Sequence, residues 1–170
     1  MRFAYALFVL AAGCSVLDFN VDQDIEEQVI EGSPLPGVLD GFLAAPIQLD
    51  LQSEIAAQET GPVDQVRLTS LSFDITATAR PAGDTDDWSF LTSVDLYVES
   101  TMAGSNLPRT KVASVTNPGA VTRLVFTPVD GVNLLPYVNE GARLVTEASG
   151  NAPPDDVSFA GRAVFRVSPL

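Results

Sequence analysis

Three carboxylates stand close together between two segments of alternating apolar residues, at Asp84, Asp86 and Asp87. Hard oxygen ligands at this spacing are the kind that Ca²⁺ prefers. Trp88 follows directly, and its ring could stack on a sugar or on a side chain of a partner. The Asp84–Trp88 turn therefore makes a Ca²⁺-binding or carbohydrate-binding module one hypothesis for this chain.

A purely structural explanation competes with that hypothesis. Asp is a common turn-forming residue, and the segment lacks the Gly and the final Glu of a helical Ca²⁺-binding loop. Asp155 and Asp156 form a second acidic turn of the same character. Trp88 alternates in phase with Phe90 and Val94, which predicts a position in the core. We therefore expect turn formation to account for these carboxylates more readily than an ion, and Ca²⁺ is the only cofactor that the sequence raises.

The sequence offers little support for catalytic chemistry. The chain contains no histidine, so Ser-His-Asp, Cys-His and histidine-based zinc sites are excluded. The only lysine, Lys111, lies in an expected strand without a motif around it. The 22 carboxylates always offer pairs for glycoside hydrolysis, yet no pair stands out. A net charge of −13 argues against nucleic acid. We expect a protein that is not an enzyme.

The only cysteine, Cys14, ends a segment with the layout of a secretory signal peptide. Arg2 supplies a positive charge, Phe3–Ala12 is an apolar run, and small residues precede the cysteine. The run is too short to span a membrane, which takes about 20 apolar residues. An ordinary cleavable signal would leave a free thiol at Cys14.

The segment Leu10-Ala11-Ala12-Gly13-Cys14 resembles the lipobox of bacterial lipoproteins. In that class the chain is cut just before the cysteine, whose thiol and new amino group are acylated. The position three before the cysteine is usually Leu and here is Ala11. The resemblance implies a cell-envelope protein held in the lipid bilayer through acylated Cys14, and Ser15 after the cysteine leans towards the outer membrane.

These features divide the chain into residues 1–13 as a cleaved signal, 14–16 as the acylated cysteine with a very short tether, and 17–170 as one domain. The apolar residues of this domain recur mostly with period 2, which predicts β-strands. Any functional site in the domain is therefore held by strands and the turns between them. We expect strands over 17–29, 46–51, 63–79, 88–99, 111–115, 121–127, 142–148 and 157–167. In the first of them Gln23 and Glu27 fall on the apolar side and interrupt the alternation.

Several details refine this pattern. The alternation reverses near Thr69-Ser70, which predicts a β-bulge there. Residues 121–127 are apolar on both parities, which favours a central strand. One or two helical turns are expected at 52–58, and a short helical or irregular crossover within 130–139. Tyr137 in that crossover either hydrogen-bonds across a corner or lies at the surface. About eight strands without long helices predict an all-β fold, an antiparallel β-sandwich.

One loop is more apolar than an exposed loop usually is, and it contains Leu39, Phe42 and Leu43. These side chains either cap one end of the sandwich or form an exposed patch for a partner. We therefore expect a membrane-anchored envelope lipoprotein that acts as a structural or protein-binding module. Its expected partners are other envelope proteins, bound through sheet edges or through this loop.

Overall fold

The computed structural model describes residues 17–33, 39, 47–59, 61–77 and 85–170. Within these residues it contains two antiparallel sheets, with the strand orders β1-β9-β3-β6 and β2-β8-β4-β5-β7. The all-β sandwich is confirmed, with nine strands in the described residues. Their bounds are β1 Phe19–Ile30, β2 Ile47–Leu49, β3 Val63–Thr76, β4 Leu91–Ser100, β5 Thr110–Thr116, β6 Arg123–Val125, β7 Thr127–Pro128, β8 Ala142–Gly150 and β9 Val157–Pro169.

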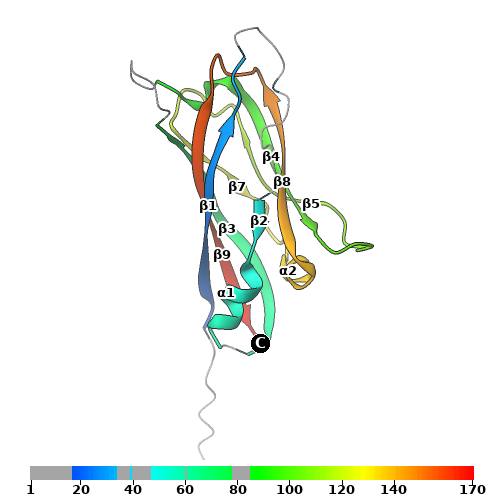
Figure 1. Cartoon of the computed structure of the whole chain (residues 1–170). Helices are drawn as coiled ribbons and strands as arrows, with labels where there is room; N and C mark the ends of the chain where they lie inside the picture. The colour runs from blue at the N-terminus through cyan, green and yellow to red at the C-terminus, as the bar shows by residue number, and fades with distance from the viewer. Residues whose placement is uncertain (1–16, 34–38, 40–46, 60, 78–84) are drawn as a thin grey trace, which may run out of the picture.

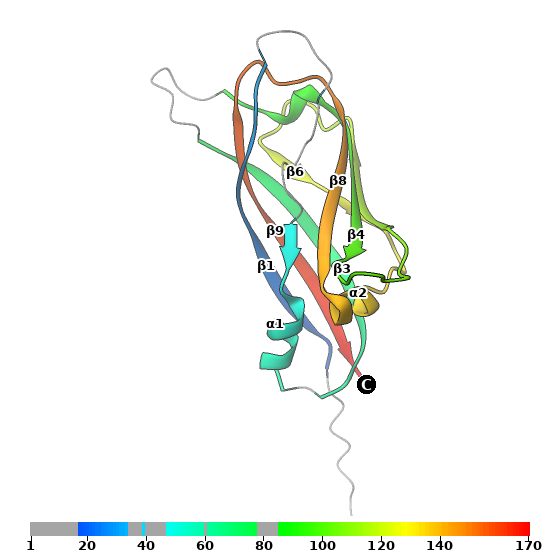
Figure 2. The same cartoon turned by 45° about the vertical axis from the view of Figure 1, so that its right-hand side comes forward.

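Two short α-helices lie towards the same end of the sandwich: α1, Leu51–Ala57, and α2, Leu135–Glu140. The start of β1 and the carboxyl end of β9 are at that end too (Figures 1 and 2). A third short helix, η1, Trp88–Phe90, is a 3-10 turn at the opposite end. No helix in the described part of the chain is long and apolar enough to cross a bilayer.

The bulge expected in β3 is present. Pairing between β3 and β9 shifts register between Leu68 and Ser70. Leu68 and Leu71, on opposite sides of the shift, are both buried although their separation is odd. One extra residue reverses the side of the sheet that later side chains meet, so both halves of the strand bury their apolar residues.

The structure corrects two of the expected strands. Trp88 belongs to η1, and the strand begins at Leu91. The segment 121–127 is not central: β6 forms the edge of one sheet and β7 the edge of the other. Leu124 and Phe126 are buried, whereas Val125 between them is 60% exposed. The segment does alternate, and its exposed valine conceals the alternation in the sequence.

Aromatic rings from separate elements fill the interior between the sheets. The ring of Phe73 lies with its centroid 5.0 Å from that of Phe126 and 5.1 Å from that of Phe159. Trp88 extends the cluster, at 5.4 Å from Phe159. These edge-on and tilted contacts are the arrangements that aromatic pairs prefer. Phe73 of β3 and Phe159 of β9 therefore join Trp88 of η1 to Phe126, which lies between β6 and β7, in one aromatic cluster.

Candidate functional site

The two acidic turns lie together at the η1 end of the sandwich. Asp86, Asp87 and Asp155 line a hollow of about 250 Å³. Asp84 lies outside the described residues. Asp87 has a structural task, because its Oδ1 accepts a hydrogen bond of 2.8 Å from the backbone N–H of Ser89 and caps η1. Among the residues that the structure describes, no group of three or more His, Cys, Asp or Glu is arranged to hold a metal ion.

Trp88 is a core residue. Its side chain is fully buried, and its indole N–H donates a hydrogen bond of 3.2 Å to the carbonyl of Thr122. Both the apolar body and the polar atom of the side chain are therefore used inside the protein. The ring offers no face for a sugar, which removes the carbohydrate-stacking role considered for Trp88.

Leu39 is also a core residue, which agrees with the alternative that it caps one end of the sandwich. It is 7% exposed and belongs to the main apolar cluster. Its backbone N–H donates to the carbonyl of Gly150 at the end of β8, at 3.4 Å. The side chain covers the end of the sandwich because its apolar surface is removed from water there. Phe42 and Leu43 lie outside the described residues, as does Cys14.

β1 is the longest strand at the edge of either sheet in the described part of the chain. It pairs with β9 over Phe19–Ile30 and has no other strand neighbour among the described residues. Its outward-facing residues include Asp22, Asp24 and Glu26, all exposed. The Asp22 carboxylate lies 2.9 Å from the Arg162 guanidinium on β9, which raises the pKa of that arginine.

A polar cleft lies beside this edge. It has a volume of about 350 Å³, and Gln23 and Gln28 of β1 line it opposite Gln48 of β2. The Oε1 atom of Gln23 is buried and accepts no hydrogen bond within the described residues. A buried acceptor left in this state costs free energy.

One residue that interrupts the alternation of β1 in the sequence lines this cleft, although the alternation alone does not explain why it is polar. Gln23 occupies the core parity of β1, between buried Val21 and Ile25. Pairing then shifts register between Ile25 and Gln28, so Glu27 turns outward and is exposed. Glu27 therefore interrupts the alternation because of the bulge, whereas Gln23 interrupts it because it lines the cleft.

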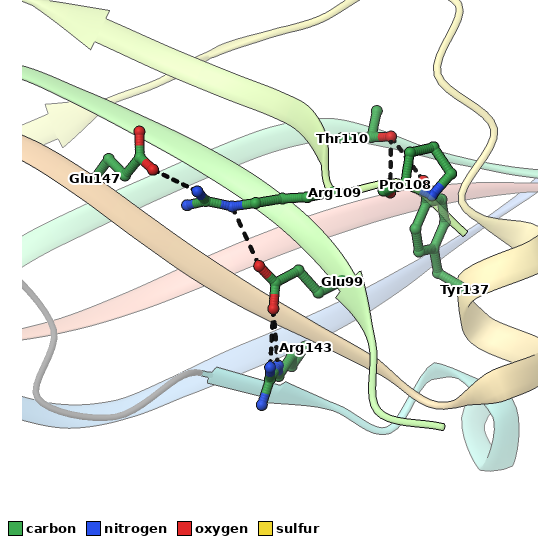
Figure 3. A network of polar contacts seen from close by, with 7 residues as sticks. All are labelled: Glu99, Pro108, Arg109, Thr110, Tyr137, Arg143 and Glu147. Atoms are coloured by element: carbon green, nitrogen blue, oxygen red, sulfur yellow. Dashed lines mark hydrogen bonds and ion pairs between the residues drawn. The ribbon is translucent and has the colours of Figure 1, made fainter. Parts of the chain in front are cut away.

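A charge network covers the outer face of the larger sheet (Figure 3). The Arg109 guanidinium contacts Glu99 at 3.2 Å and also Glu147, and the Arg143 guanidinium contacts Glu99 at 2.9 Å. Arg109 also lies over the ring of Tyr97, 4.0 Å from its centroid. The charges connect β4 and β8 to the segment entering β5 and neutralise one another. Partly exposed pairs of this kind contribute little stability each.

Two further polar groups on the molecule have partners. The Lys111 Nζ atom lies 2.6 Å from the Asp95 carboxylate, so the only lysine is part of an ion pair. Hydrogen bonds from Ser105 and Ser100 hold the pKa of Glu140 below its usual value of 4.5. Both side chains therefore take part in contacts on the surface of the sandwich.

Tyr137 makes the corner contact that its position suggested. Its hydroxyl donates to the carbonyl of Pro108 at 2.7 Å and lies 2.7 Å from Thr110 Oγ1 (Figure 3). The side chain is 5% exposed. The contact attaches α2 to the segment that enters β5.

A second hollow opens between α1 and α2. It has a volume of about 420 Å³. Apolar side chains of both helices and of the start of β3 line it, and its polar residues are uncharged except for one glutamate. The lining residues are Gln52, Ile55, Ala56, Glu59, Gly61, Val63, Leu135, Val138 and Asn139. We call it the α1–α2 groove. No pattern in the sequence predicts it, because the lining residues of α1, β3 and α2 come together only in the fold.

Comparisons with known proteins identify no family. No family model matches the chain, and no curated protein matches it. Solved structures that resemble it include a decameric BFDV capsid protein, with a TM-score of 0.42 and 8% identity over 91% of this chain and 98% of that one. Another is the empty head of turnip yellow mosaic virus, with a TM-score of 0.28 and 15% identity over 100% of this chain and 92% of that one. At these TM-scores we draw no conclusion from the likeness.

Proposed function

We propose that this chain is a lipid-anchored, non-enzymatic protein of the bacterial cell envelope that binds a partner protein along the edge of β1. The observation that carries the binding role is the edge itself, which pairs on one side only among the described residues and borders the glutamine-lined cleft. The anchor rests on the lipobox resemblance ending at Cys14.

The geometry of the described residues suits such an anchor. Leu17, three residues after Cys14, is 79% exposed and lies two residues before the start of β1. An anchor at Cys14 would hold this end of the sandwich at the membrane surface. A strand of 12 residues spans about 40 Å. The edge of β1 would then extend away from the bilayer, and the acidic turn at Asp86 would be at the far end.

The chemistry of the β1 edge defines the partner. An added strand would gain backbone hydrogen bonds along β1. The exposed carboxylates of Asp24 and Glu26 favour a partner segment with Lys or Arg. The charges and the bulge before Gln28 also discourage unselective edge-to-edge pairing. The expected partner is therefore an extended, basic segment of another envelope protein.

Membrane fractionation of Cys14→Ser tests the anchor. The variant should move from the membrane to the soluble fraction, and Ser15→Ala, the matched control beside it, should stay in the membrane. Unchanged fractionation of Cys14→Ser would refute the anchor.

Photocrosslinking in the native membrane tests the binding edge. A photoreactive residue at Asp24 should capture one dominant neighbour. The matched control is a photoreactive residue at Thr92, which is exposed on β4, a strand with neighbours on both sides. Equal capture from both positions, or no capture at position 24, would refute a partner at the β1 edge.

A further inference from the structure

We infer that the α1–α2 groove binds one acyl chain of the protein's own Cys14 anchor. The inference rests on the proposed lipidation and adds a site on the folded domain for the lipid. Its basis is the position of the groove relative to the N-terminal end of β1, its size, and the chemistry of its lining.

The pairing register places the groove within reach of Cys14. Phe19 pairs with Val167, and continuing that register sets Leu17 opposite Pro169. Pro169 pairs on its other side with Val63, which lines the groove. Neighbouring strands are about 4.8 Å apart, so Leu17 and Val63 are separated by roughly 10 Å. Three residues of chain span up to about 10 Å. A lipid attached at Cys14 can therefore reach the groove without any rearrangement of β1.

The groove is large enough for a long part of an acyl chain. An apolar cavity of about 150 Å³ holds benzene, with six carbons. The groove has about 420 Å³, and in proportion this volume would hold roughly 17 carbons. Because it is open to solvent, the buried part of a chain is shorter than that.

The lining selects a hydrocarbon chain rather than a lipid headgroup. Val138 is buried at 4% exposure, and Ile55, Val63 and Leu135 are partly buried around it. The one charged residue of the lining, Glu59, would repel a phosphate. A tethered chain also competes at a high effective concentration, which a free lipid of the bilayer does not have. The occupant that fits best is therefore the protein's own acyl chain.

The test uses the full-length protein made in cells that are supplied with a fatty acid carrying a photoreactive diazirine. After illumination in the membrane, peptide mass spectrometry maps where the label has reacted. We expect a crosslink within one molecule, joining the Cys14 peptide to peptides of residues 52–63 or 135–139. Adducts of these peptides with whole phospholipids would instead identify a bilayer lipid as the occupant and overturn the inference.

A pair of tryptophan substitutions in α1, one that fills the groove and one that does not, provides the matched comparison. Ala56→Trp places a large side chain in the groove, whereas Ala57→Trp places it on an exposed residue of the same helix that does not line the groove. The intramolecular crosslink should fall at least fivefold in Ala56→Trp and stay unchanged in Ala57→Trp. Equal yields in the two variants would overturn the inference.

The mass of the Cys14 peptide separates this inference from the proposed function. An unmodified peptide would refute lipidation, and the groove inference would fall with it. An acylated peptide whose label reacts only outside the groove would refute the groove inference alone.

Discussion

Replacing Tyr137 by Phe removes one hydroxyl and keeps the ring. In the native protein that hydroxyl makes two contacts of 2.7 Å, one with the carbonyl of Pro108 and one with Thr110 Oγ1. The site is buried, so water cannot easily replace the lost partner. A hydrogen bond contributes about 0.5–1.5 kcal/mol to stability. Thr110 Oγ1 also donates to Pro108 at 3.2 Å and offsets part of the loss. We expect Tyr137→Phe to lower the free energy of unfolding by about 1–2 kcal/mol.

Tyr97→Phe is the matched control. It also removes a hydroxyl, but the ring that Arg109 covers at 4.0 Å remains. The free energy of unfolding should change by less than about 0.5 kcal/mol. Urea denaturation followed by fluorescence measures both variants. In a domain of this size, 1 kcal/mol shifts the melting temperature by about 2–4 °C.

Hydrogen exchange gives the prediction a local readout. The backbone N–H of Val138 in α2 donates to the carbonyl of Leu134, the residue just before the helix, at 3.0 Å. Its exchange should become faster in Tyr137→Phe and not in Tyr97→Phe, because only the first substitution releases α2 from the segment entering β5. Equal destabilisation by the two substitutions would refute the role assigned to the Tyr137 hydroxyl.

Three further outcomes follow from the structure. Gly161→Ala should cost about 1–3 kcal/mol in urea denaturation, because the added Cβ would lie 2.5 Å from Cδ1 of Phe73; no loss would contradict the packing around Phe73. Asp87→Ala should cost about 1 kcal/mol through the lost cap of η1, with the same loss in millimolar Ca²⁺. A Ca²⁺-dependent rise in melting temperature that Asp87→Ala abolishes would instead support the predicted ion site. The pKa of Glu140 lies below 4.5 in the folded state, so its contribution to stability is complete above pH 4.5 and disappears as the pH falls through the folded pKa. The stability difference between the native protein and Glu140→Gln should therefore shrink on acidification, and a pH-independent difference would contradict the assigned shift.

The strands could be predicted where burial alternates strictly along the chain. In β3 the reversal near Thr69 located the bulge, because period-2 alternation responds to a single extra residue. The run of apolar residues at 121–127 wrongly predicted a central strand, because exposed Val125 in β6 is as apolar as its buried neighbours. Hydrophobicity alone does not report which apolar side chains remain in water. Sheet membership there depends on pairing with residues far away in the sequence.

The candidate sites were less predictable than the strands. Leu39 is buried because the end of β8 is available to cover it, and that contact is long-range. The α1–α2 groove forms between segments about 80 residues apart in the chain. Gln23 was the exception, since a polar residue on the core parity of an apolar strand is a local signal. It lies at the cleft beside β1.

The most direct test of the lipid anchor is the mass of the N-terminal peptide of the protein isolated from its native membrane. The account predicts that the mature chain begins at Cys14 and that this residue carries acyl chains on its thiol and its amino group. A mature chain that begins at another residue, or an unmodified Cys14, would contradict it.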